Sequence, residues 1–92
     1  MDLFRDMRTF VCVVDEHSCP AAARALDLAP AVVTKQVAEL EAHLGARLLN
    51  RTTRRMSLTE VGEAYLDDAR QILAVVEEAE AGASRSVSEL RG

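Results

Sequence analysis

A chain of 92 residues is enough for one small domain and excludes a separate catalytic domain. Apolar residues make up 49% of the chain and aromatic residues only 3%, so the core must be aliphatic and modest, and a second copy would help to stabilise it. The net charge of −4 would disfavour nucleic acid if it were spread evenly, but residues 30–58 carry +3, whereas residues 1–29 carry −2 and residues 59–92 carry −5.

The first predicted element is a helix over residues 2–16. Its apolar residues fall on one face, and they are Leu3, Met7, Phe10, Val11 and Val14. The valines near the end would also suit a strand, but the spacing favours a helix. We expect this helix to be the platform on which the next two helices pack, with Ser18 capping the second of them.

Residues 18–45 predict two short helices separated by a tight turn. Pro20 opens an alanine-rich run, as suits a first helical turn. Pro30 interrupts the helical pattern and biases Ala29 toward an extended conformation. The pattern resumes at Ala31 and runs to Leu44, where Gly45 supplies a left-handed stop.

The helix predicted over residues 31–44 has two different faces. One is an apolar stripe formed by Val33, Val37, Leu40 and Leu44. The opposite side is short, smooth and basic, and it comprises Ala31, Val32, Thr34, Lys35, Ala38 and Ala42. Small residues with a cation among them suit a helix that enters a DNA major groove, which is about 12 Å wide. We interpret the pair as a helix-turn-helix with residues 31–44 as the reading helix; a plain helical hairpin is the alternative.

After Gly45 the sequence predicts a basic wing. Leu48-Leu49 and Met56-Ser57-Leu58 would form two short strands, joined by a polar tip over residues 50–55. Strong donors gather in that tip, namely Arg51, Thr52, Arg54 and Arg55. Such a tip is suited to straddling a phosphate backbone or reaching the minor groove, and a solvated loop is the alternative.

A long helix is predicted from Thr59, its cap, to about Leu90. Gly62 in its first turn suggests close approach to a neighbouring backbone. Small and apolar residues recur along it at heptad-like spacing, and they are Tyr65, Ala69, Ile72, Val76, Ala79 and Ala83. Because three short helices cannot cover a helix of this length, we expect this stripe to be a homodimer interface. A solvated single helix is the alternative.

Other chemistries find little support in the sequence. The spacing of Cys12, His17, Cys19 and His43 fits no usual zinc site, so no metal and no cofactor are expected. Catalytic arrangements and phosphate-cradling glycine loops are missing, so the chain is not expected to be an enzyme. Two cysteines without a secretory or membrane-spanning segment suggest a cytoplasmic protein with reduced thiols. Glu39 and Glu41 are expected to flank the reading helix and to discourage misplaced phosphate contact.

One set of motifs runs through all of these elements with consistent residue types and spacing. It comprises Phe10 with Val13-Val14, Ser18, Ala21-Ala22-Ala23-Arg24-Ala25-Leu26, Leu28, Pro30 to Val37, Leu40-Glu41, Leu44-Gly45, Leu48-Leu49, Arg51-Thr52-Thr53-Arg54 and Leu58-Thr59-Glu60-Val61-Gly62. With these motifs, residues 3–75 resemble the N-terminal DNA-binding domain of LysR-type transcriptional regulators.

The resemblance implies a mainly α, winged helix-turn-helix fold over residues 1–58 and a linker helix over residues 59–92 that pairs antiparallel with that of a second copy. It implies sequence-specific binding of double-stranded promoter DNA by a dimer. The implied contacts are Pro30, Ala31, Val32, Thr34 and Lys35 on the reading helix, and Arg51, Thr53, Arg54 and Arg55 in the wing. We add Ala38 from its place on the small, basic face. The family normally carries a C-terminal domain that binds a small-molecule inducer and drives tetramer formation, and we expect that domain to be absent here.

Three residues depart from the family pattern, which usually has glycine at His17, an aromatic at Cys19, and Thr or Ser at Pro20. Cys19 fills less volume than an aromatic, so we expect looser packing between the first two helices. A protein-interaction module, in which the long helix docks a partner and the basic face is incidental, is the alternative function.

Overall fold

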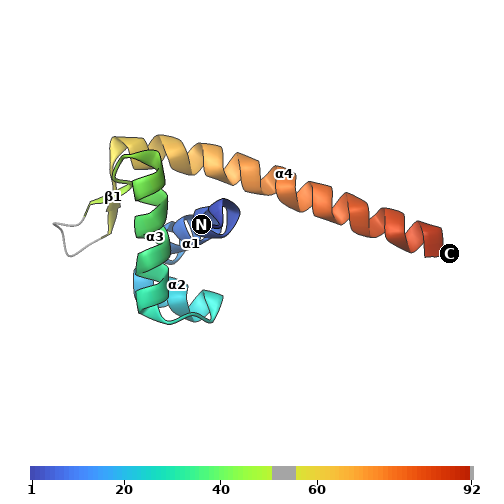
Figure 1. Cartoon of the computed structure of the whole chain (residues 1–92), viewed down its shortest axis with the longest axis horizontal. Coiled ribbons are helices and arrows are strands. Elements are labelled where there is room, and N and C mark those ends of the chain that lie inside the picture. Colours follow the sequence, from blue (N-terminus) through green and yellow to red (C-terminus); the bar gives the residue numbers. More distant parts are fainter. Residues whose placement is uncertain (51–55, 92) are drawn as a thin grey trace.

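The computed structural model describes residues 1–50 and 56–91. The elements in chain order are α1 (Leu3–Glu16), α2 (Cys19–Leu26), α3 (Pro30–Leu44), β1 (Leu49–Asn50), β2 (Ser57–Leu58) and α4 (Glu60–Arg91). Helices α1, α2 and α3 pack together at one end of the molecule, and α4 projects from them as a rod, so the molecule measures 55 × 26 × 22 Å (Figure 1). Strands β1 and β2 pair antiparallel, with Leu49 opposite Leu58. The predicted mainly α, winged helix-turn-helix architecture is confirmed.

Polar caps and left-handed residues set the helix boundaries. The Oγ of Ser18 accepts a hydrogen bond from Ala21 N at 3.1 Å, and the Oγ1 of Thr59 accepts one from Gly62 N at 2.9 Å, so both predicted caps are confirmed. Gly45 ends α3 with a φ of 68°. The start of α3 is a small correction: Pro30 is its first residue rather than a break before it. A first-turn residue needs no N–H donor, so a proline fits there.

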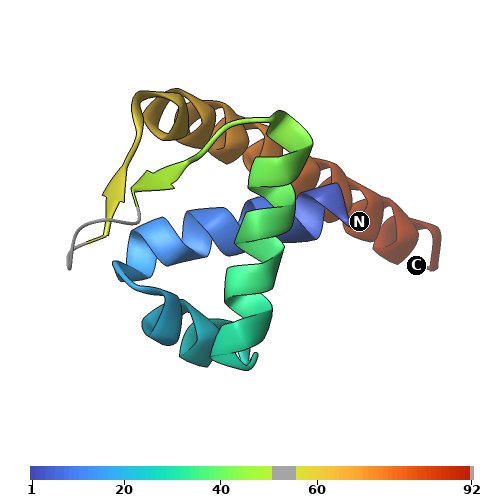
Figure 2. The same ribbon diagram turned by 60° about the vertical axis from the view of Figure 1, so that its left-hand side comes forward.

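The core forms where α1 and α3 cross. Figure 2 shows α3 running in front of α1, with α2 below α1 and beside the lower end of α3. Phe10 and Val13 of α1 meet Val33, Val37 and Leu40 of α3 in one buried cluster, as their spacing predicts. Leu44, by contrast, is 38% exposed and does not complete the apolar stripe, because α3 extends beyond α1 there. Because the apolar side of α3 is buried against α1, the opposite side of α3 faces solvent.

His17 ends α1 in the left-handed conformation, with a φ of 65°, and its side chain is exposed. A side chain in that conformation is strained, whereas glycine is not, so His17→Gly should raise the free energy of unfolding by about 0.5 to 1 kcal/mol. Gly45→Ala should lower the free energy of unfolding, because Gly45 has a φ of 68° that strains any side chain. Nothing lies within 4 Å of the added Cβ, so this backbone strain acts without a steric clash. Urea denaturation measures the free energy of unfolding of both variants. A change of the same sign in both would contradict the role of the left-handed conformation.

Glu41 joins the end of α3 to the first strand. Its side chain is 8% exposed, and its Oε2 accepts hydrogen bonds from Leu48 N at 2.8 Å and Leu49 N at 3.4 Å. The expectation that Glu41 repels phosphate beside the reading helix is therefore wrong. Its carboxylate satisfies buried backbone donors at the base of the β1–β2 hairpin, which fixes that hairpin relative to α3.

The first half of α4 packs on the body of the domain. Tyr65 lies against Phe10, with ring centroids 6.0 Å apart, and Ala69 and Leu73 form a buried cluster with Met7. The Nη2 of Arg70 donates to Asp15 Oδ1 at 2.7 Å and adds a polar tie to α1. None of the helices in the described ranges is both long and apolar enough to cross a bilayer.

This packing corrects the N-terminal part of the predicted dimer stripe. Ala69 is fully buried beside Met7 within a single chain, so it is not free to meet a second copy, whereas Tyr65 is only half-buried and its place in the interface stays a prediction. Farther along, Ile72, Ala79 and Ala83 are exposed and Val76 is half-buried. An apolar stripe therefore remains uncovered on the outer part of α4.

Candidate nucleic-acid interface

The outer face of α3 is free within the chain. All six residues predicted there to contact DNA are exposed, and they are Pro30, Ala31, Val32, Thr34, Lys35 and Ala38. The Lys35 side chain is 75% exposed. No acidic residue stands in the first turn, and Ala29 makes no side-chain cap, so the positive end of the helix dipole is left uncompensated there. The first turn of this face therefore combines small side chains with positive potential, as an approach to a polyanion requires.

A buried hydrogen bond fixes the rotation of α3 against α1. The Oγ1 of Thr9 lies 2.6 Å from Gln36 Oε1 and donates to it, and both residues are buried. The apolar periodicity of α3 did not reveal this contact, since Gln36 is a polar residue that directly follows Lys35. Any turn of α3 about its own axis would break this bond and redirect Lys35 on the other side, so the pair positions the exposed face.

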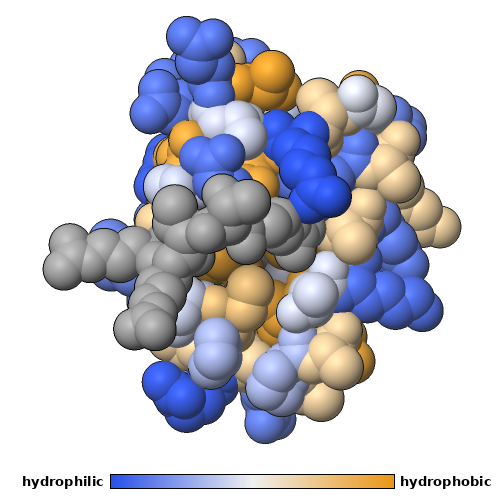
Figure 3. Space-filling model, turned by 90° about the vertical axis from the view of Figure 1, so that its left-hand side faces the viewer, coloured by the Kyte–Doolittle hydropathy of each residue, from blue (hydrophilic) through white to orange (hydrophobic). Residues whose placement is uncertain are grey.

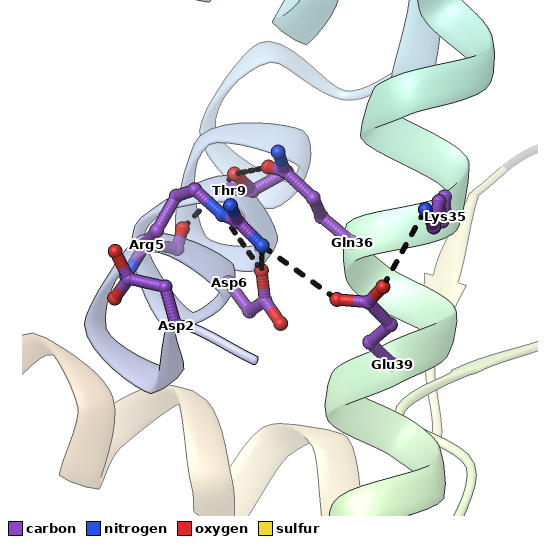
Figure 4. Close-up of polar contacts among 7 residues, drawn as sticks. All are labelled: Asp2, Arg5, Asp6, Thr9, Lys35, Gln36 and Glu39. Carbon is purple, nitrogen blue, oxygen red and sulfur yellow. Dashed lines mark hydrogen bonds and ion pairs between the residues drawn. The ribbon is translucent and has the colours of Figure 1, made fainter.

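Four charged residues form what we call the α1–α3 charge cluster, namely Arg5, Asp6, Lys35 and Glu39 (Figure 4). The Nε and Nη2 of Arg5 donate to Asp6 Oδ1 at 3.2 and 3.1 Å, and the Asp6 side chain is fully buried. The same Nη2 lies 3.6 Å from Glu39 Oε2, while Glu39 Oε1 lies 4.0 Å from Lys35 Nζ. Cations and carboxylates thus alternate from α1 to the exposed face of α3.

The base of the wing lies beside the end of α3. The Nδ2 of Asn50 donates to Ser57 Oγ at 3.0 Å and to Leu58 O at 3.3 Å, which ties the strands across their open end. An open hollow lies along the C-terminal half of α3 and the segment that follows it, and small residues and a cation line it: Ala38, Ala42, Gly45, Ala46 and Arg47, with Glu41. The predicted wing contacts Arg51, Thr53, Arg54 and Arg55 lie outside the described residues, so their roles stay predictions.

Figure 3 looks onto the side of the molecule that carries the hairpin. On the part of this face that the grey residues do not cover, pale tan residues alternate with blue, hydrophilic ones, and strong orange shows only in patches. A surface of this kind is unlike the continuous apolar patch that marks a protein docking site, and it suits a hydrated, charged ligand such as DNA.

The surroundings of Cys12 do not activate its thiol. Burial, and after it the carboxylates of Glu16 and Asp15, raise the pKa of the Cys12 thiol, which disfavours the reactive thiolate. No group of His, Cys, Asp and Glu residues that could hold a metal ion occurs among the described residues.

Comparison with known proteins identifies the family of the chain. Residues 4–63 match the family model for bacterial regulatory helix-turn-helix proteins of the lysR family. The chain belongs to the LysR family. Among its relatives is an HTH-type transcriptional repressor of Pseudomonas aeruginosa, which is 52% identical over 81 residues, covering 88% of this chain and 26% of the relative. The chain spans about a quarter of the length of the curated relatives that it matches.

Solved structures of LysR DNA-binding domains share the fold. The BenM DNA-binding domain in complex with catB site 1 DNA superposes with a TM-score of 0.89 at 33% identity, covering 96% of this chain and 94% of that chain. The CbnR DNA-binding domain in complex with DNA gives a TM-score of 0.84 at 34% identity, covering 95% and 99% of the two chains. The resemblance to LysR-type regulators stated from the sequence is confirmed.

Proposed function

We propose that this chain is the DNA-binding part of a LysR-type transcriptional regulator and binds a specific double-stranded promoter sequence as a homodimer. The observation that carries the proposal is the exposed face of α3, which has small side chains, presents Lys35 and begins at a helix N-terminus without an acidic residue, in a LysR chain whose structural relatives include DNA-binding domains solved with DNA. The chromosome is in the bacterial cytoplasm, so we expect the protein to act there.

In the proposed complex, α3 enters the major groove and the wing follows the phosphate backbone. Lys35 is the residue on α3 best suited to reach a base edge, because lysine can donate to the O6 and N7 acceptors of guanine. Ala31, Val32 and Ala38 are short enough to allow close approach and to contact thymine methyl groups. Arg51, Arg54 and Arg55 would supply phosphate contacts that hold the register, with Thr53 as an additional donor.

The outer part of α4 supports the proposed homodimer. Its exposed apolar residues include Ile72 and Val75, which are 40% and 63% exposed. Together with Val76 and with Phe4 of α1 they line an apolar hollow, and Ala79 and Ala83 continue the stripe. Burying this stripe against the same stripe of a second copy would remove it from water and give a symmetric interface. In a longer parent, inducer binding and tetramer formation would belong to a C-terminal domain.

Lys35→Ala should weaken binding to the preferred site by about 1 to 3 kcal/mol if Lys35 contacts a base edge, and should relax the preference at that base pair. Fluorescence anisotropy with labelled duplexes measures both effects. Arg85→Ala is the matched control, because it removes one exposed positive charge from α4, far along the chain from α3. Equal losses for the two variants would contradict a base contact by Lys35.

Selection of bound sequences from a random pool of duplex DNA tests the function itself. A homodimer with two reading helices should enrich two inverted half-sites at a fixed spacing. No enrichment over the starting pool would contradict sequence-specific binding, and a single half-site would contradict the dimer.

A further inference from the structure

Glu39 is a carboxylate on the proposed DNA-reading helix, one turn after Lys35. Its two oxygens face different cations: Oε2 lies 3.6 Å from Arg5 Nη2, and Oε1 lies 4.0 Å from Lys35 Nζ. Figure 4 shows Glu39 lying between these two cations, with Arg5 reaching over from α1. An acid that approaches DNA raises the free energy of every complex in which a phosphate comes near it, so its position needs a reason.

Stability is a weak reason for this arrangement. The side chain of Lys35 is 75% exposed, so its ion pair with Glu39 contributes little to folding. The other Glu39 oxygen, Oε2, is buried on the Arg5 side and makes no hydrogen bond among the described residues. The inner pair differs, because Asp6 is fully buried and Arg5 donates to it through two nitrogens. Arg5 therefore compensates the buried charge of Asp6. The contact between Glu39 and Lys35 adds little to that compensation.

The charges of the cluster cancel. Arg5 and Lys35 are cations, and Asp6 and Glu39 are carboxylates. The middle of α3 therefore carries a lysine at its surface, yet offers a nearby phosphate almost no net positive charge. Sequence-independent binding to DNA is almost entirely electrostatic, so this part of the interface contributes little to it. When Lys35 leaves Glu39, a short hydrogen bond from Lys35 to an acceptor on a base edge can still replace the lost ion pair.

We propose that Glu39 is a specificity-determining residue of the DNA-binding face: its carboxylate holds Lys35 and repels phosphate, so that only a correctly placed base edge recruits the lysine. Arg5 is the positioning residue that keeps Glu39 on the α1 side of α3. This inference rests on the proposed function. It concerns the ratio of affinities for preferred and unrelated DNA, which a residue can raise by weakening the unwanted complexes.

The test is Glu39→Gln, which keeps the shape of the side chain and removes its charge. Binding is measured to the preferred duplex and to a scrambled duplex of equal length over a series of salt concentrations. We expect the affinity for scrambled DNA to rise about fivefold near 0.1 M salt, with a steeper salt dependence, while the affinity for the preferred site changes less than about twofold. The specificity ratio should thus fall at least about 2.5-fold.

Two further variants make the result decisive. Glu78→Gln removes the same charge from an exposed position on α4, so it reports the effect of net charge alone. Glu39→Asp keeps the charge and should retain most of the specificity ratio. The inference is overturned if Glu39→Gln changes both affinities equally or acts like Glu78→Gln, or if Glu39→Asp loses the ratio as fully as Glu39→Gln. If the unmodified chain prefers no duplex over another, the proposed function itself has failed.

Discussion

Replacing Gly62 with alanine should lower the free energy of unfolding by about 2 to 4 kcal/mol, even though alanine has a higher helix propensity than glycine. The added Cβ would fall well inside 3.0 Å of the carbonyl oxygen of Leu48, which is backbone and cannot rotate away. Leu48 itself is buried, its N–H donates to Glu41 Oε2 at 2.8 Å, and its carbonyl accepts from Thr59 N at 3.0 Å. Either α4 or the base of the hairpin must therefore shift.

Gly82→Ala is the matched control for Gly62→Ala, because the same change is made in the same helix. Its Cβ would come no closer than 3.7 Å to a neighbour, the Nη2 of Arg85, which is an ordinary contact. We expect helix propensity to prevail there, with a gain of up to about 1 kcal/mol. Urea denaturation followed by circular dichroism measures both variants. A gain in stability for Gly62→Ala would contradict the close packing of α4 on the Leu48 backbone.

Gly62→Ala should also weaken DNA binding, since the same backbone places the wing. The strands flank the tip predicted to contact phosphate, and Glu41 ties the hairpin base to α3 through Leu48 and Leu49. A shift of this base changes the distance between wing and reading helix. The stability effect and the binding effect would therefore share one cause.

Local sequence patterns predicted the helices and caps because short-range chemistry determines these features. Ser18, Gly45 and Thr59 act within one helical turn, and their roles follow from residue type and position. The close approach at Gly62 was also predicted, since glycine in a helix interior otherwise weakens the helix. The small, basic face of α3 was predictable in the same way, because it follows from a spacing of about 100° per residue.

Contacts between distant residues were harder to predict. Heptad-like spacing indicated that one side of α4 is apolar, but it could not show that α1 buries Ala69 and packs against part of Tyr65 within the chain. Glu41 was misread for the same reason: its partners are backbone N–H groups on β1, and a backbone donor leaves no mark in a sequence. The bond between Thr9 and Gln36 joins residues that are 27 positions apart, and no periodicity reports it.

Ala79→Glu should abolish the proposed homodimer and with it tight binding to a paired site. Ala79 is exposed on the outer part of α4, in line with Ile72 and Ala83, and in a symmetric dimer each copy would bring one glutamate into the apolar interface. When two half-sites are bound by linked reading helices, the second contact is intramolecular, so its loss should weaken binding at least about 100-fold. Sedimentation velocity and anisotropy on the two-half-site duplex measure these effects.

Ala74→Glu separates the interface from the charge. Ala74 is also an exposed alanine of α4, but it projects about 140° around the helix axis from Ala79 at 100° per residue, on the side away from Ile72. Both variants add one negative charge to an already acidic helix, so repulsion from DNA is nearly the same in each. A dimer that survives Ala79→Glu, or a loss of affinity that Ala74→Glu reproduces, would place the contact between copies elsewhere. A monomer from Ala79→Glu that still binds a single half-site would show that α4 sets the assembly and α3 reads the DNA independently.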